Sequence, residues 1–262
     1  MKIQFISHLF RYDDATQCEY RKVRIEIGQV LVSAFIYKQV ISSSLHIKII
    51  NSHQRYSDLS DCTIRRLEFS PNATTATFPF PPHGDPTDFE GIVDTVYCHT
   101  GITSIGTLGA NVNNVIFKEP ASIEIIESGD FSSCGFSEFI LPTSVKTIQG
   151  QAFSGCSSLE KFIIPKEARL SKIETTSSTP PYSTTSYYGA FYLSYHVSII
   201  CCLREPISIN YLFYCSSNYK YASDGILYVP ENSIEKYKSS QWNSEFADIQ
   251  TIEDSEYADW NL

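Results

Sequence analysis

The 262-residue chain lacks most of the sequence features that mark membrane proteins and nucleic-acid-binding proteins. Its apolar runs are all shorter than the roughly 18 residues that a membrane-spanning helix needs. Positive charge is scarce, with 20 Lys and Arg against 29 Asp and Glu for a net charge of −9, and no basic cluster is present that would bind a phosphate backbone. We therefore expect neither membrane insertion nor a nucleic-acid partner.

The sequence also lacks a recognisable catalytic or metal-binding motif. The eight cysteines contain no CxxC pair, and the six histidines are scattered without HExxH spacing. Neither a GxSxG element nor a phosphate-binding glycine motif occurs. We accordingly assign no catalytic residue, no metal ligand and no cofactor, and we expect a protein without enzymatic activity.

Methionine and tryptophan are rare, with one and two residues, whereas Tyr and Phe number 17 and 16. Aromatic and β-branched side chains pack well on pleated surfaces, so this composition favours strands. One sequence element recurs: Asp-Phe-Ser-Ser-Cys at 130–134 and Ala-Phe-Ser-Gly-Cys at 152–156 are 22 positions apart. Phe191 and Phe213 show the same offset. A fixed offset of this length indicates an array of structural repeats.

A second pattern runs in step with the first, namely apolar residues spaced three and then two positions apart. Because alternate side chains of a strand point to one face, the last two members of each triplet predict the inward residues of a short strand. Pro142 and Pro165 mark where the chain leaves the sheet, and Val145, Ile148 and Phe153 would fill the far side of the coil. The triplets are Val93/Val96/Cys98, Val112/Val115/Phe117, Phe136/Phe139/Leu141, Leu159/Phe162/Ile164 and Val197/Ile200/Cys202.

The run from Leu141 to Pro165, LPTSVKTIQGQAFSGCSSLEKFIIP, resembles the BspA-type leucine-rich repeat family almost position for position. Residues 227–238, followed by Trp242 and Ile249, resemble the closing segment common in bacterial surface proteins of that family. The resemblance implies a β-rich leucine-rich-repeat solenoid, with short stacked parallel strands and irregular or short helical returns. It also implies an adhesion role at the cell surface or in secreted form. Residues 1–11 do not predict a signal peptide, because His8 breaks their short apolar run, so an intracellular location stays open.

The repeat divides the chain into segments. Residues 1–61 lack it and alternate as strands do at Val23–Ile27 and Leu45–Ile49, which predicts a β-rich N-terminal cap or small domain. A Ser/Thr/Pro-rich insertion is expected to form a surface loop. The solenoid, this insertion and a C-terminal tail are expected at residues 62–252, 174–188 and 253–262.

The cysteines of the repeats are expected to be structural. Cys134 and Cys156 stand at nearly constant distance before successive triplets, which predicts a ladder of small buried side chains, since free Cys is among the most buried residue types. Cys98 and Cys202 occupy predicted inward positions. Cys201 is expected to face outward, either as an ordinary exposed thiol or as a reactive one.

The residue between the second and third triplet positions should face solvent, which predicts an exposed apolar ladder along the strands. Such stripes mark binding surfaces, because monomers seldom leave large apolar patches in water. The alternative is that these residues serve only strand propensity and cross-strand packing. The ladder, our predicted partner-binding face, comprises Tyr97, Ile116, Ile140, Ile163, Cys201 and Tyr228.

Two functions follow from this organisation. The first is a non-enzymatic scaffold whose strand-lined surface binds a protein or glycan partner, as extended repeat proteins do. The second is a structural stalk or spacer, with the contacts made by residues 1–61 or by the loop at 174–188.

Overall fold

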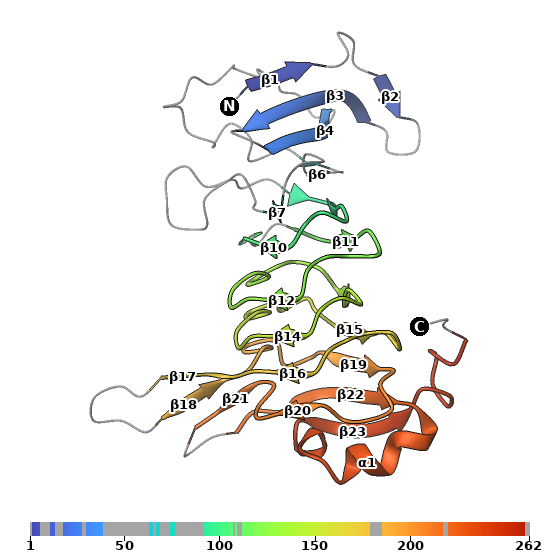
Figure 1. Ribbon diagram of the computed structural model, residues 1–262. Helices are drawn as coiled ribbons and strands as arrows, with labels where there is room; N and C mark the ends of the chain where they lie inside the picture. The colour runs from blue at the N-terminus through green and yellow to red at the C-terminus, as the bar shows by residue number, and fades with distance from the viewer. Residues whose placement is uncertain are drawn as a thin grey trace.

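A computed structural model shows an elongated stack of coils with an antiparallel sheet at its N-terminal end and a short helix at its C-terminal end (Figure 1). This architecture is the predicted β-rich leucine-rich-repeat solenoid. The structure describes residues 2–5, 11–13, 18–27, 30–38, 63–64, 67–68, 74–76, 92–106, 108, 112–178, 185–216 and 220–259.

The N-terminal strands form an antiparallel sheet that continues into the first coil. Strand β3 pairs with β1, β2 and β4, and β4 pairs with β5, which in turn pairs in parallel with β8. The expected strand at Val23–Ile27 is therefore confirmed, while 45–49 lies outside the described residues. The strands are β1 (Lys2–Phe5), β2 (Arg11–Asp13), β3 (Cys18–Ile27), β4 (Val30–Lys38), β5 (Thr63–Ile64) and β8 (Ile92–Val93).

One wall of the solenoid consists of two parallel sheets, to which each coil contributes one short strand. We call the outward side of these sheets the strand face. The first sheet has the order β11–β9–β6, and the second has the order β13–β15–β19–β22–β23. Their strands are β6 (Leu67–Glu68), β9 (Val96–Cys98), β11 (Val115–Phe117), β13 (Glu138–Ile140), β15 (Lys161–Ile164), β19 (Ser198–Cys201), β22 (Ser223–Val229) and β23 (Phe246–Thr251).

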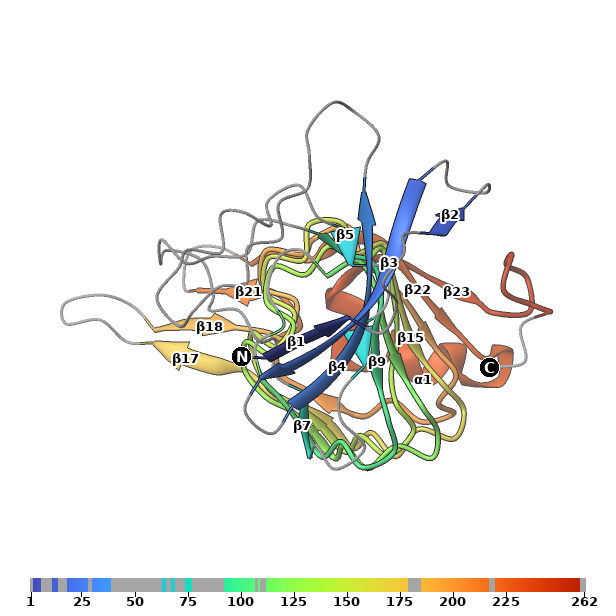
Figure 2. The same ribbon diagram turned by 90° about the horizontal axis from the view of Figure 1, so that it is seen from above.

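The opposite wall is made of even shorter parallel strands, from which an antiparallel hairpin projects. The hairpin replaces the surface loop expected at 174–188, and it points away from the strand face (Figure 2). Gly150 makes room for its base, because a side chain there would collide with the backbone of Thr176 and Tyr188. The elements are β7 (Thr75–Ala76), β10 (Ser104–Ile105), β12 (Ile125–Ile126), β14 (Thr147–Ile148), β16 (Lys172–Ile173) and β20 (Ser208–Ile209), with β17 (Thr176–Ser178), β18 (Ser186–Tyr188) and β21 (Tyr214–Cys215) in the hairpin sheet.

The core between the walls contains a ladder of phenylalanines from successive coils. The rings of Phe131 and Phe153 stack with centroids 5.1 Å apart, and those of Phe153 and Phe191 with centroids 5.4 Å apart. Phe139 and Phe162 stack beside them and meet Phe153 edge to face. Such pairs stabilise a core by about 0.5–1.5 kcal/mol each beyond the area they bury. The expected 22-residue period is therefore the spacing of an aromatic stack.

The recurring cysteine is buried, as expected, and it also forms a hydrogen bond between coils. The Cys156 thiol donates to the carbonyl oxygen of Phe131, with the sulfur 3.0 Å from that oxygen. In the next coil Ser194 takes its place and donates to the carbonyl oxygen of Phe153 at 2.8 Å. Burial raises the pKa of Cys156 to about 12, so the thiol keeps its proton. The position requires a small buried donor, which both Cys and Ser provide.

A helical cap closes the C-terminal end of the stack. Trp242 is fully buried and donates its indole N–H to the carbonyl oxygen of Ile207 at 2.9 Å. The buried carboxylate of Glu245 accepts the backbone N–H of Leu212 at 2.9 Å and lies 2.8 Å from the Lys220 ammonium. These groups satisfy backbone polar atoms of the coil on which the cap packs. The cap contains η2 (Glu231–Ser233), α1 (Ile234–Lys238) and η3 (Gln241–Ser244).

Candidate functional site

The outward residues of the strand face form a continuous row within the second sheet. Ile140 is the register partner of Ile163, Ile163 of Ile200, and Ile200 of Tyr228. In the first sheet, Tyr97 and Ile116 are paired in the same way. Five of the six predicted residues therefore lie on the strand face, three in the second sheet and two in the first, and Ile200 is a member that the sequence pattern missed.

Cys201 was predicted on the row, and that prediction is wrong. It pairs with Ile164, an inward residue, and it is fully buried with its sulfur 3.1 Å from the Tyr237 hydroxyl oxygen. Cys202, predicted inward, instead packs against the outer cluster of Ile163 and Ile200. The triplet at 197–202 was placed one residue too far along, and a slip of one residue exchanges the two faces of a strand. Burial raises the pKa of Cys201 to about 11, which excludes a reactive thiolate near neutral pH.

Only part of the row is exposed. Ile116 and Ile140 are 41% and 52% exposed, as predicted, whereas Ile163 and Ile200 are fully buried. Tyr97 and Tyr228 are half-buried. The expected exposure of Ile163 is wrong because the chain returns over it after β23.

We call residues 252–259 the strap. It turns back along the strand face toward β15 and β19 (Figure 1). Its Tyr257 is 3% exposed and forms one cluster with Ile163 and Ile200, and its ring meets that of Tyr228 edge to face at 4.9 Å. The Lys161 ammonium lies 3.7 Å from the Glu256 carboxylate and 5.3 Å from the centre of the Tyr257 ring.

An open groove of about 530 Å³ lies beside the exposed isoleucines. Among the described residues no strand pairing joins β11 to β13, so the ladder is interrupted there. The two coils are held at one end by a bond from the Gly135 N–H to the Val112 carbonyl oxygen, and at the other by Glu119, whose carboxylate accepts the backbone N–H of Thr143 at 3.0 Å. Residues of both strands and the turns after them line the groove, among them Ile116, Glu119, Glu138 and Ile140.

A second surface of interest surrounds the hairpin. We call it the tyrosine array, and neighbouring ring centroids in it lie 5.0–5.9 Å apart. Tyr221 is 47% exposed, and the others are half-buried. Tyrosine is favoured at interfaces because it combines a large apolar ring with a polar tip. The array comprises Tyr188, Tyr192, Tyr195, Tyr214 and Tyr221.

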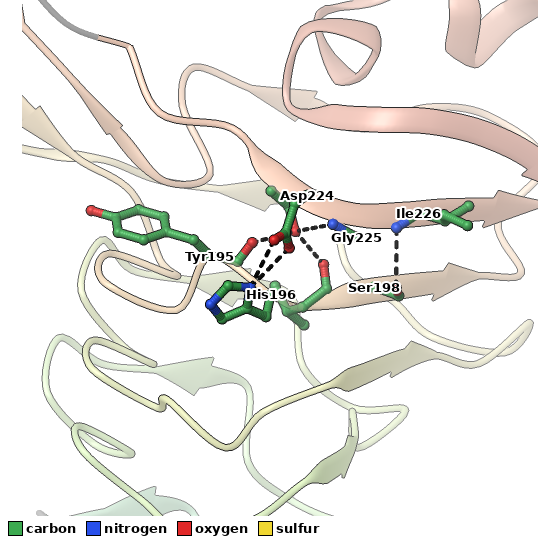
Figure 3. Close-up of polar contacts among 8 residues, drawn as sticks. Tyr195, His196, Ser198, Asp224, Gly225 and Ile226 are labelled. Carbon is green, nitrogen blue, oxygen red and sulfur yellow. Dashed lines mark hydrogen bonds and ion pairs between the residues drawn. The ribbon is translucent and has the colours of Figure 1, made fainter.

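A histidine–carboxylate pair adjoins this array. His196 Nδ1 lies 2.8 Å and 3.0 Å from the two carboxylate oxygens of Asp224, and both side chains are about 70% exposed (Figure 3). The nearby hydroxyls bind backbone: Ser223 donates to the Val197 carbonyl oxygen, and Ser198 accepts the Ile226 N–H. These two hydroxyls are therefore engaged with the backbone, while Asp224 orients the imidazole. Within the described ranges no group of three metal-ligating side chains occurs.

Comparison with known proteins agrees with the repeat architecture. Residues 108–177 match the family model described as BspA type Leucine rich repeat region (6 copies). Within residues 108–177 the repeats are of the BspA type. No curated protein matches the chain. A leucine-rich repeat protein from Bacteroides ovatus ATCC 8483 is similar at a TM-score of 0.29 and 13% identity, over 87% of this chain and 67% of that one.

The BspA-type match covers the coils that carry the exposed isoleucines and the groove. β11 and β13 both lie inside the matched residues, whereas the strap lies beyond them. In the parts of the chain that the structure describes, no helix has the length and apolar character needed to cross a membrane.

Proposed function

We propose that the chain is a non-enzymatic interaction scaffold that binds a protein partner through the groove between β11 and β13, at the cell surface or in secreted form. The observation that carries this proposal is the pair of exposed isoleucines beside an interrupted ladder. Strand edges without a ladder partner present backbone donors and acceptors that another polypeptide can pair with. Ile116 and Ile140 supply the apolar contact area beside these edges.

A protein partner suits this groove better than a glycan. Its exposed apolar residues are aliphatic, and the one aromatic residue that lines it, Phe117, packs against the buried core. The surface location rests on the BspA type of the repeats.

The test compares two variants of the full chain, one altered on the strand face and the other on the opposite wall. Ile116→Lys/Ile140→Lys places two charges beside the groove, while Ile125→Lys alters an isoleucine that is 44% exposed on the opposite wall. Partners captured from neighbouring or host cells are identified by mass spectrometry, purified, and titrated against each chain. We expect at least a tenfold loss of affinity for the first variant and none for the second. Equal binding by both would refute the proposal.

The tyrosine array favours a second candidate, in which the coils act as a spacer and the hairpin region makes the contacts. A glycan fits this surface, because aromatic rings stack on sugar faces while the hydroxyls and the His196–Asp224 pair supply polar contacts. Tyr221→Ser removes the most exposed ring of the array. Loss of binding to a glycan array in this variant, with Ile116→Lys/Ile140→Lys unaffected, would favour the spacer function.

A further inference from the structure

The strap begins at Ile252, whose N–H donates to the Val229 carbonyl oxygen and whose side chain packs beside Ile163 and Ile200. The Glu253 carboxylate then accepts the backbone N–H of Glu231 in the cap. Tyr257 supplies the strap's buried side chain, and Lys161 contacts both Glu256 and the Tyr257 ring. Several of its other hydrogen bonds are local, such as those from the Ser255 hydroxyl to the Ile252 carbonyl oxygen and from the Tyr257 N–H to the Ser255 hydroxyl. Beyond Ile252 the strap has local turns and one buried side chain, that of Tyr257, so this part can be released while the coils beneath stay folded.

The site under the strap and the exposed part of the strand face form one surface. Ile163, which the strap covers, is the direct register partner of exposed Ile140. Lys161 is likewise the register partner of Glu138, which lines the groove. The strap therefore covers one end of an apolar row whose other end lies beside the groove.

We propose that the strap is a displaceable intramolecular ligand of the strand face, and that the partner presents a short segment with an aromatic residue next to an acidic one. Such a segment takes the place of Tyr257 on Ile163 and Ile200, pairs its carboxylate with Lys161, and continues over Ile140 to the groove. This inference rests on the proposed function, because it names the partner chemistry of the same face.

The chemistry of the partner is read from the strap itself. Two buried isoleucines accept one flat ring, and the cation beside them attracts both a carboxylate and the ring face. A ligand that is linked to its own site competes at a high effective concentration, so an external segment binds weakly until the strap is weakened. A partner must therefore bind this site tightly enough to displace the strap, which favours partners with an aromatic residue next to an acidic one.

The probe is a fluorescent nine-residue peptide that copies residues 251–259, TIEDSEYAD, titrated by anisotropy. The receptors are the full chain and its Tyr257→Ser variant, in which the strap loses its anchor. We expect the peptide to bind the variant at least tenfold more tightly than the unaltered chain. A peptide with Ser in place of its Tyr is the matched control and should not bind either receptor. Absence of binding to the variant, or equal binding to both receptors, would overturn the inference.

Cys202 gives a second readout that needs no added peptide. It packs against the cluster that Tyr257 covers, so its alkylation reports release of the strap. Tyr257→Ser should raise the rate of Cys202 modification, resolved by mass spectrometry, at least fivefold without changing that of fully buried Cys156. An unchanged Cys202 rate would mean that the strap does not cover the face in solution.

The two proposals fail in different ways. If the peptide binds the variant while Ile116→Lys/Ile140→Lys keeps its captured partner, the site under the strap stands, whereas the groove proposal and the path of the partner over Ile140 fail. If the captured partner depends on Ile116 and Ile140 while the peptide binds nothing, the groove stands and the strap is only a structural tail.

Discussion

Ile140 and Ile163 occupy the same position of neighbouring coils, yet the first is 52% exposed and the second is fully buried. Beneath them the coils are alike, since Phe139 and Phe162 stack at 5.5 Å on the inward side. The difference arises outside the repeat, because Tyr257 of the strap packs on Ile163 and Ile200 while Ile140 stays exposed. In this solenoid the repeat specifies the interior, and a segment beyond the repeat decides which part of the outer surface is available.

The largest loss of stability should come from a change in the phenylalanine stack that the coils share. Phe153→Ala removes a ring that stacks on Phe131 and Phe191 and touches Phe139 and Phe162. The loss of buried area and the cavity left behind should lower the free energy of unfolding by about 3–5 kcal/mol. Urea denaturation measures this, and a loss below about 1 kcal/mol would show that the aromatic stack is not the common core.

The covered coil should respond strongly to a charge on its outer side. Ile163→Lys places an ammonium under Tyr257 and beside Lys161, which should cost about 2–4 kcal/mol from lost apolar burial and poor solvation of the charge. In a Tyr257→Ser background the same change should cost much less, because the site is already open. A double-mutant cycle by urea denaturation measures this coupling, and strict additivity would contradict the contact.

A buried carboxyl group, that of Asp130, lies in the core at a position where later coils have alanine. Asp130 corresponds to Ala152 and is 4% exposed, and burial raises its pKa to about 7, although a bond from the Glu127 N–H opposes the shift. Because the folded-state pKa lies above that of the unfolded chain, folding favours the protonated acid. Stability should therefore fall as pH rises from about 4 to 7, by an amount on the order of 1–3 kcal/mol.

Asp130→Ala isolates that effect. The variant should lose the part of the pH dependence between about pH 4 and 7 and should be the more stable chain at pH 8, as measured by its melting temperature. A variant that keeps the full slope would place the titrating group elsewhere.

The sequence was a good guide where the repeat governs and a poor one where it does not. The buried positions of Val145, Ile148 and Phe153 follow from spacing alone, because every coil repeats them. Cys201 was misplaced because the insertion at 174–188 interrupts the count, although Ser-Ile-Ile-Cys at 198–201 aligns residue for residue with Lys-Phe-Ile-Ile at 161–164.

The repeat pattern does not predict contacts between segments that are distant in the sequence. Residues 252–259 carry ordinary turn signals, and nothing local indicates that Tyr257 returns to the strand face. The groove is equally invisible, since it depends on whether β11 and β13 meet in register. A carboxyl group such as Asp130 was detectable in principle, because it stands where the aligned coil has Ala152.

The smallest change in stability is expected at Ile140, the exposed counterpart of Ile163. Ile140→Lys should change the free energy of unfolding by no more than about 0.5 kcal/mol, because its side chain already lies in water and the strand can present a lysine there. Ile140→Lys and Ile163→Lys should be measured by the same urea titration. The two residues occupy equivalent strand positions, so the comparison isolates the effect of the strap that covers Ile163. A cost for Ile140→Lys close to that of Ile163→Lys would mean that both residues are buried in solution, and that another segment of the chain covers the groove.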